Sequence, residues 1–540
     1  MFRVQRRFLI AGIIPFLCVF SQTLLQYNII FALGGMVNHT LADWEEWQVI
    51  EEEQVHGDLN FPGTCIKVGD EGLMGGKVDI YDDGPFPWDA EIEGLINAII
   101  SAGSMVGTLM TLFVYDHIDG NLVFAIALGF PGLISILTPI FAENGGYQSV
   151  VIFRFFTGLY TSILTPVIPT LVSTWFLPTE LYKMNIIVFL GMETGRMFFC
   201  FTGNIIDNFG WEFLFYFPGV LAVILGLLYF LIMTDDPLEN PFLYTEEKQM
   251  IADAQERMFV PIEDPKLSRR QKIMKRMMKN KMNINISRTG AHKKSVPWKS
   301  ILTEKMLWIS ALQATGQAWT TVMMVLMNKE YLEEIHGYTL QEAAIMVTIP
   351  NNVAQFFIAL ATGFFGDFLL KKNVSKITIR RFGSIIQILA VLPMLILPFL
   401  PCNVMEYRVA MILIQVLSSF RVVGNLSGYS SYRDISPTYQ RHLFGVAAII
   451  SQCIPGIVVP ALMGVFDTET IIQWKYNYVT NCSFVIFSNL VYCFLVSTDR
   501  ATWDPGSRIE ERGGDETRSI IESIGARSYV FEANRLKKTS

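Results

Sequence analysis

Four charged side chains lie inside long apolar stretches of the chain: Arg154, Glu193, Arg196 and Arg421. An ionised group within a membrane is costly, so by default it indicates a functional site or a buried ion pair. Glu193 and Arg196 are three residues apart on one helix face, and can pair with each other or take part in substrate or ion coupling. Arg154 can contact backbone carbonyls or a carboxylate, or contribute to coupling or gating. Arg421 can bind an anion, pair with Glu193 or extend to the membrane surface.

Neutral amides form a second set of candidate residues. Gln22 and Gln26 are four residues apart, Asn28 is close to them, and Gln313 and Gln317 repeat the same spacing. Each pair therefore shares a helix face. Such amides either join neighbouring helices by hydrogen bonds or line a solute site.

Membrane helices have to position these residues. The chain has 540 residues, of which 51% are hydrophobic and 17% charged, against about 25% charged in an ordinary soluble domain. The apolar residues lie in blocks of about twenty, enough to cross a hydrocarbon core of about 30 Å as helices. We therefore predict an all-α polytopic membrane protein with twelve transmembrane helices, near residues 8–34, 92–114, 121–142, 148–172, 184–206, 211–233, 301–325, 341–365, 379–401, 407–429, 442–466 and 478–497.

Composition and motifs exclude several other classes. The net charge of −7 disfavours a nucleic-acid partner. The seven cysteines form no CxxC pair, so no metal site is predicted. The chain has no phosphate-binding loop, nucleophile elbow or metal-ligand cluster. We expect neither an enzyme nor a bound cofactor.

The loops divide the chain into two six-helix halves, residues 1–234 and 301–497. The linker 235–300 holds twelve basic and no acidic residues between Lys266 and Lys299. The positive-inside rule places this linker, both termini and the polar tail 498–540 in the cytoplasm. The linker should begin as a capped amphipathic helix. Its basic part is either a helix on the anionic inner leaflet or a simple topogenic segment.

The first outer loop, residues 38–91, is long and acidic. It is either a solvated loop or an antechamber that concentrates cations. Asn38 begins a glycosylation sequon, which favours a lumenal or extracellular face. Asn285 and Asn373 also match the sequon but lie in predicted cytoplasmic loops. Cys65 could pair with Cys402 or Cys482, which are predicted on the same side.

Two six-helix halves joined by a long basic linker are the arrangement of a major facilitator transporter, in which the halves rock about a site near the midplane. Residues 154–183, RFFTGLYTSILTPVIPTLVSTWFLPTELYK, and residues 210–219, GWEFLFYFPG, further resemble the anion:cation symporter family. That family includes sialin, the vesicular glutamate transporters and the type I sodium–phosphate cotransporters. Further similar segments are residues 235–247, 295–298, 331–338, 434–439 and 474–476. The resemblance implies a carrier of organic anions or phosphate, driven by a proton or sodium gradient.

The chain departs from this family where the family's functional residues lie. By this resemblance, Gln26 and Gln317 stand where the family has its two substrate-binding arginines. Thr161 stands in place of the family's proton-linked glutamate, and Pro169 in place of a histidine. Asn28 matches the family's asparagine. An arginine offers a fixed charge and a planar fork, but a glutamine offers a neutral amide. A hydroxyl cannot take the place of a titratable carboxylate. We therefore expect weak or absent transport of the family's usual dicarboxylates or glutamate.

Three functions follow from these residues. The first is a secondary active transporter of small organic anions or phosphate, with Gln26, Asn28, Gln317 and Arg421 binding the solute. Thr161, Glu193, Arg196 and Arg154 are candidates for coupling or gating. The second is a carrier of a neutral or zwitterionic solute, which the paired glutamines favour. The third is a receptor or scaffold that keeps the fold without transport. In each case we expect a monomer in a plasma, vesicle or lysosome-type membrane.

Overall fold

The computed structural model describes residues 6–37, 84–88, 90–114, 118–177, 180–259, 296–325, 327–336, 344–400, 404–465 and 470–504. Every regular element in these ranges is a helix, and one isolated bridge joins Val37 to Phe86. The N-terminal half contains α1 (Arg6–Phe8), η1 (Leu9–Ile13), α2 (Ile14–Met36), α5 (Ala90–Val114), α6 (Gly120–Leu164), α7 (Ile168–Trp175), α8 (Leu181–Phe198), η2 (Phe199–Phe201), α9 (Thr202–Phe209) and α10 (Phe213–Ile232).

The linker contributes α11 (Thr245–Phe259), which overlaps only the end of residues 235–248, where a capped amphipathic helix was predicted; residues 235–244 form turns. The elements that follow it are α13 (Trp298–Thr303), α14 (Lys305–Val325), α15 (Met327–His336), η3 (Ala344–Thr348), α17 (Ile349–Lys371), α18 (Lys376–Ile396), η4 (Leu397–Phe399), α19 (Val404–Ser418), η5 (Ser419–Leu426), α20 (Gly428–Ile435), α21 (Gln440–Val465) and α22 (Ile471–Leu495).

Helices occur at all twelve predicted positions, and nine segments of the described chain are long and apolar enough to span a membrane. One of the nine, Gly120–Trp175, covers the third and fourth predicted spans, which meet at Gly146 with φ of +62°. Helices α8 and α14 are not among the nine. Charged and amide side chains, such as Glu193 in α8 and Gln313 in α14, make both helices less apolar than the rest.

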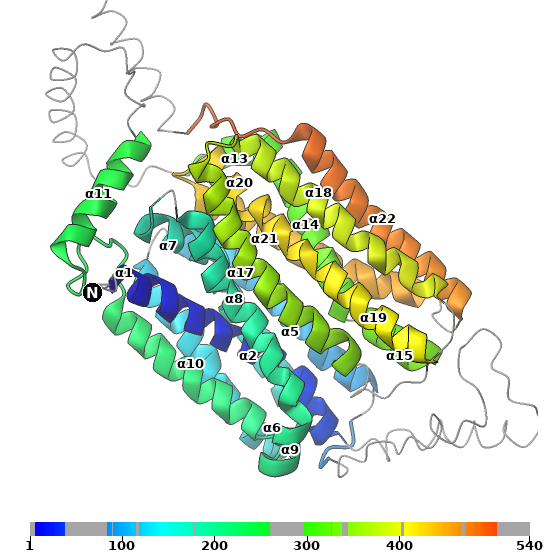
Figure 1. Ribbon diagram of the computed structural model, residues 1–540. Coiled ribbons are helices and arrows are strands. Elements are labelled where there is room, and N and C mark those ends of the chain that lie inside the picture. Colours follow the sequence, from blue (N-terminus) through cyan, green and yellow to red (C-terminus); the bar gives the residue numbers. More distant parts are fainter. Residues whose placement is uncertain are drawn as a thin grey trace, which may run out of the picture.

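The two halves contact each other along two helix pairs. Helix α8 lies beside α17 (Figure 1), and α5 packs against α21. Each half also has its own apolar core, one around Trp175 in the N-terminal half and one around Trp474 in the C-terminal half. The fold is therefore two separately packed units that meet along α8–α17 and α5–α21.

Glycines let α5 and α6 approach closely. A Cβ atom at Gly107 would lie 1.9 Å from the carbonyl oxygen of Leu159, and one at Gly103 would lie 2.1 Å from that of Phe155. The Gly-xxx-Gly spacing places both glycines on the same face of α5. Small residues at this spacing are typical of tightly packed membrane helices.

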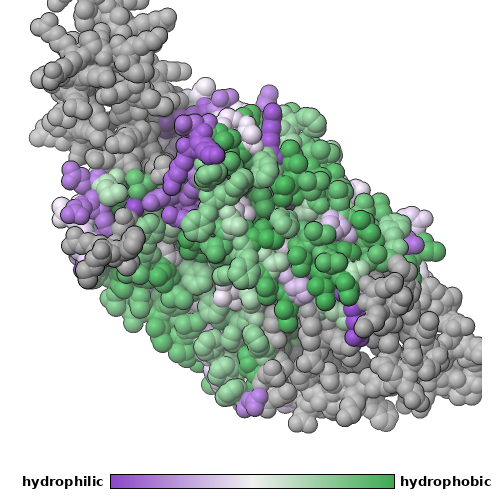
Figure 2. Space-filling view, in the orientation of Figure 1, coloured by the Kyte–Doolittle hydropathy of each residue, from purple (hydrophilic) through white to green (hydrophobic). Residues whose placement is uncertain are grey.

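The surface separates into an apolar band and polar ends. Figure 2 shows hydrophobic residues covering the middle of the helices, with hydrophilic residues gathered toward the end that carries α11 and α13. Large hydrophobic side chains exposed on α17 and α18 include Phe365, Phe368 and Leu389. In a membrane this band faces lipid tails, and it fits the integral, multi-pass protein expected from composition.

One end of the bundle, which we call the linker face, holds the start of α1, the helix α11 and the segment after α22. The buried Arg7 pairs with Glu180 at 3.2 Å, and its backbone N–H donates to Glu247 of α11 at 3.2 Å. On the other half, Ser436 donates to Asp504 at 2.6 Å. The first and last described residues thus lie at the same end, as an even number of spans requires.

Several expectations concern residues outside the described ranges. They are the glycosylation site Asn38, most of the acidic loop, the basic part of the linker, and the tail beyond residue 504. Cys65 and Cys402 are also outside these ranges. Cys482 is a free thiol, fully buried in the core of the C-terminal half. The alternative that paired Cys65 with Cys482 is therefore wrong, because that core encloses the thiol within α22.

Candidate functional site

Arg154 is held in the N-terminal half by the backbone of α2. Its guanidinium donates to the carbonyl oxygens of Leu25 at 3.3 Å and Gln26 at 2.9 Å, and to Oδ1 of Asn28 at 3.4 Å. The side chain is 3% exposed. These contacts agree with the expectation that Arg154 contacts backbone carbonyls, because its charge is stabilised by two carbonyl dipoles and one amide oxygen.

The first glutamine pair contacts α6. Nε2 of Gln22 donates to the carbonyl of Thr161 at 2.9 Å, and Nε2 of Gln26 donates to its hydroxyl at 3.3 Å. That hydroxyl donates in turn to the carbonyl of Thr157 at 2.7 Å, and Thr161 is fully buried. Thr161 therefore joins α2 to α6. Gln26 keeps some exposed surface, whereas Gln22 is buried.

Asn28 lies deeper in the same half. Its Nδ2 donates to the hydroxyl of Ser135 at 3.2 Å, and Ser135 donates to the carbonyl of Phe215 at 2.8 Å. Asn28 is 3% exposed, and its Oδ1 accepts from Arg154. It thus connects three helices. Pro169, at the start of α7, is also buried.

The second glutamine pair occupies the corresponding place in the C-terminal half. Nε2 of Gln313 donates to Oε1 of Gln387 at 3.0 Å, and Gln317 donates to Oδ1 of Asn425 in η5. Gln313 is fully buried, whereas Gln317 keeps some exposed surface. In both halves, then, the second glutamine of the pair is the more accessible one.

The remaining three charges meet where the halves join. Arg196 and Glu193 form an ion pair at 2.6 Å, which is one of the two alternatives that their spacing left open. Arg421 of η5 donates to the hydroxyl of Thr321 at 2.9 Å and is 5% exposed. Its burial rules out the alternative in which Arg421 extends to the membrane surface.

Gln355 of α17 connects Arg421 to Glu193. A carboxylate only accepts hydrogen bonds and a guanidinium only donates them, which assigns the amide nitrogen of Gln355 to the side of Glu193. In that orientation it donates to the two carboxylate oxygens at 3.1 and 2.7 Å. Its oxygen accepts from Nε of Arg421 at 3.1 Å, and also from Nη2. We call Glu193, Arg196, Gln355 and Arg421 the interhalf cluster.

Sequence reasoning singled out three members of the interhalf cluster but assigned no role to Gln355. The signal that could have found it is weak: a glutamine within the apolar segment predicted as the eighth span. Thr321 and Asn425 were likewise missed as partners. Each lies four residues from a singled-out residue, Gln317 and Arg421 respectively. In the α-helix α14 this spacing places Thr321 on the same side as Gln317.

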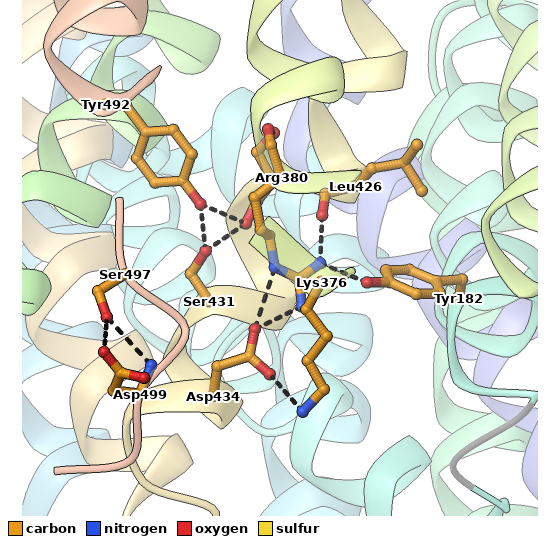
Figure 3. A network of polar contacts seen from close by, with 10 residues as sticks. Tyr182, Lys376, Arg380, Leu426, Ser431, Asp434, Tyr492, Ser497 and Asp499 are labelled. Atoms are coloured by element: carbon orange, nitrogen blue, oxygen red, sulfur yellow. Dashed lines mark hydrogen bonds and ion pairs between the residues drawn. The ribbon is translucent and has the colours of Figure 1, made fainter. Parts of the chain in front are cut away.

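A second polar network lies at the linker face (Figure 3). Arg380 of α18 pairs with Asp434 at 2.6 Å and donates to the hydroxyl of Tyr182, which belongs to the other half. Lys376 also reaches Asp434, at 3.4 Å. Asp367 accepts from the backbone N–H groups of Tyr182 at 3.2 Å and Lys183 at 3.3 Å. The network ties the start of α8 to the C-terminal half.

The described part of the chain contains no group of three His, Cys, Asp or Glu side chains placed to hold a metal ion. The chemistry that these contacts support is instead the binding of a polar solute by amides and a guanidinium. That chemistry involves no covalent step.

Comparison with known proteins identifies the family. A family model described as the Major Facilitator Superfamily matches residues 15–460. The chain is 23% identical over 492 residues to a probable small intestine urate exporter of Mus musculus, covering 90% of each chain. It is 22% identical over 423 residues to sialin of Homo sapiens, covering 77% of this chain and 78% of that one.

A Danio rerio protein, vesicular glutamate transporter 2.1, is 22% identical over 480 residues, covering 84% of this chain and 74% of the relative. Among solved structures, the proton:xylose symporter XylE bound to 6-bromo-6-deoxy-D-glucose matches with a TM-score of 0.57 and 10% identity, over 90% of this chain and 95% of that one. These relatives are transporters, not enzymes. The chain is an integral multi-pass membrane protein that belongs to the major facilitator superfamily.

Proposed function

We propose that the protein carries a small organic anion across the membrane by alternating access, with the two halves rocking about the α8–α17 and α5–α21 contacts. The observation that carries this proposal is the buried Arg421, which lies where the halves meet and whose hydrogen bonds go to neutral partners, Thr321 and Gln355. A guanidinium inside a membrane is costly, and a solute anion would compensate its charge.

The accessible glutamines would complete the solute site. Gln26 belongs to the first span and Gln317 to the seventh, the equivalent helices of the two halves. Each already donates to a neighbour of its own half, namely Thr161 and Asn425. Amide groups in these places can bind the uncharged part of a solute, which would leave the anionic group to Arg421.

The names of the relatives favour the same class of solute. They include a probable urate exporter, vesicular glutamate transporters and sialin. A proton or sodium gradient would supply the driving force, with both termini in the cytoplasm and a plasma, vesicle or lysosome-type membrane as the location. The buried hydroxyl of Thr161 offers no titratable group, so coupling would have to involve other residues.

Flux into proteoliposomes tests this function. Purified protein would be reconstituted and screened with labelled organic anions, phosphate and neutral solutes under imposed pH and sodium gradients. We expect saturable anion uptake that Arg421→Gln lowers at least tenfold. The matched control is Arg381→Gln, which removes an exposed arginine on α18.

Three results would count against the proposal. Normal uptake by the Arg421→Gln variant would remove Arg421 from the solute site. Saturable uptake of neutral solutes alone would support the carrier of uncharged or zwitterionic molecules. Absence of any saturable flux with correctly inserted protein would favour a receptor or scaffold.

A further inference from the structure

The interhalf cluster contains one carboxylate, that of Glu193, and two guanidiniums, those of Arg196 and Arg421. We propose that Glu193 is an internal counter-ion that restricts the solute to a single negative charge. Gln355 lies between Glu193 and Arg421, so that Glu193 pairs with Arg196 and Arg421 is left to bind the solute. The inference rests on the proposed anion transport and deepens it by naming the charge class of the solute.

Arg196 and Arg421 differ in how they contact Glu193. Glu193 forms its ion pair with Arg196, three residues away on the same helix, at 2.6 Å. Arg421 reaches the carboxylate only through the neutral amide of Gln355, which donates to Glu193 and accepts from Arg421. Arg196 is therefore paired with the carboxylate directly, whereas Arg421 lies beyond the amide of Gln355 and feels Glu193 only from that longer distance.

The charge of the interhalf cluster follows from its members. Arg196 and Arg421 contribute two positive charges and Glu193 one negative charge, which leaves one positive charge for a solute to neutralise. A monoanion makes the occupied cluster neutral. A dianion leaves it with a net negative charge, which is unfavourable in a low-dielectric interior.

Arg154 does not alter this count. Its guanidinium is 3% exposed and donates to the carbonyls of Leu25 and Gln26 and to Asn28. Those acceptors belong to α2, within the N-terminal half. These contacts hold Arg154 within its own half, so it is not counted among the charges of the interhalf cluster.

The position of Gln355 explains why a neutral residue matters here. A carboxylate at this position would neutralise Arg421 and remove its attraction for a solute. An amide satisfies both charged neighbours, donating on one side and accepting on the other, and adds no charge. Gln355 is fully buried, so water does not replace these contacts.

The experiment compares uptake of matched anions by variants of different charge. Probes are butyrate and succinate, with three-carbon and five-carbon pairs of mono- and dicarboxylates as further tests of size. Wild-type protein, with cluster charge +1, is expected to take up monocarboxylates at least tenfold faster than the matched dicarboxylates. Glu193→Gln raises the charge to +2 and should shift the ratio at least tenfold toward dicarboxylates.

Arg196→Gln lowers the charge to zero and should reduce the uptake of both probes at least tenfold. Glu143→Gln is the matched control, because it removes an exposed carboxylate at the far end of the first half of α6. This control should keep the wild-type ratio. If Glu193→Gln does not fold, Gln355→Glu sets the cluster charge to zero while retaining the ion pair, and it must abolish anion uptake.

Thermal unfolding with each probe gives a second readout that does not depend on flux, since a ligand of the folded state raises Tm. Monocarboxylates should stabilise the wild type, and dicarboxylates the Glu193→Gln variant. Equal or greater uptake of dicarboxylates by the wild type would overturn the inference, as would a ratio that Glu193→Gln leaves unchanged. Either result would leave anion transport itself standing, whereas absence of any saturable flux would contradict the proposed function.

Discussion

The carboxylate of Asp367, near the end of α17, accepts a hydrogen bond from the backbone N–H of Tyr182 at the start of α8, at 3.2 Å. A second bond, from the N–H of Lys183 at 3.3 Å, completes a cap on the first turn of α8. A carboxylate is favoured at a helix N-terminus, where unpaired N–H groups and the helix dipole both attract it. Because these two helices belong to different halves, the cap also holds the two halves together at the linker face.

Asp367→Asn should open this face. Hydrogen bonds to a charged group contribute about 1.5–3 kcal/mol each, so we expect at least a tenfold rise in the population with the halves apart at this end. Spin labels at Met250 on α11 and Lys372 after α17, both exposed, would report that separation. Lys376→Gln is the control, since its ion pair is 59% exposed on the lysine side and should contribute little. Identical distance distributions in wild type and Asp367→Asn would contradict the prediction.

Arg154→Gln should destabilise the N-terminal half by about 2 kcal/mol, because α2 and α6 lose three charge-assisted contacts. Arg154→Lys should recover only part of this loss, since an ammonium cannot reproduce the guanidinium fork. Thermal unfolding in detergent measures the effect, with exposed Arg381→Gln as the reference. A variant that unfolds like wild type but loses transport would instead assign Arg154 to coupling.

Gly107→Ala should separate α5 from α6, because its Cβ would lie 1.9 Å from the backbone carbonyl oxygen of Leu159. We expect a loss of about 1–3 kcal/mol, as for other overpacked sites. Gly94→Ala on the same helix is the matched control, with nothing within 4 Å of the new methyl group. There the alanine should be neutral or stabilising by up to about 1 kcal/mol. Equal Tm values for both variants would show that the close approach contributes nothing.

Gln26→Arg together with Gln317→Arg should strengthen the binding of carboxylates. The two changes place guanidiniums at equivalent positions of the first and seventh spans, and each adds a charge inside the membrane. We expect at least a tenfold lower Kd, larger for dicarboxylates than for monocarboxylates, as measured by displacement of a labelled anion. The single variants serve as controls, and unchanged affinity in the double variant would mean that these side chains do not face the solute.

The architecture could be predicted from the sequence because it depends on local properties. Apolar blocks of sufficient length located helices at all twelve positions, and the three-residue spacing of Glu193 and Arg196 gave their ion pair as one of two alternatives. A helix was also expected near the start of the linker, although α11 begins ten residues after Asp235, where the prediction began. Each of these features depends on neighbours within a few turns of the same helix.

The contacts between helices could not be predicted in the same way. Gln355 is 162 positions from Glu193 along the chain, and only the packing of α8 on α17 brings their side chains together. Thr161 is a second residue whose contacts could not be predicted from the sequence. Its alignment with a proton-linked position suggested a role in coupling, but its hydroxyl is buried between Gln26 and the carbonyl of Thr157. Burial of this kind depends on tertiary structure, which spacing does not reveal.

The contact between Arg7 and Glu247 has a consequence for the order of assembly during synthesis. The N–H of Arg7 donates to a carboxylate 240 positions later, and Arg6 donates to the carbonyl of Phe242. The beginning of the first helix can complete its contacts only after the ribosome has made all six spans of its own half and the start of α11. All of these partners precede the second half in the sequence, so these contacts need no residue of the second half in order to form.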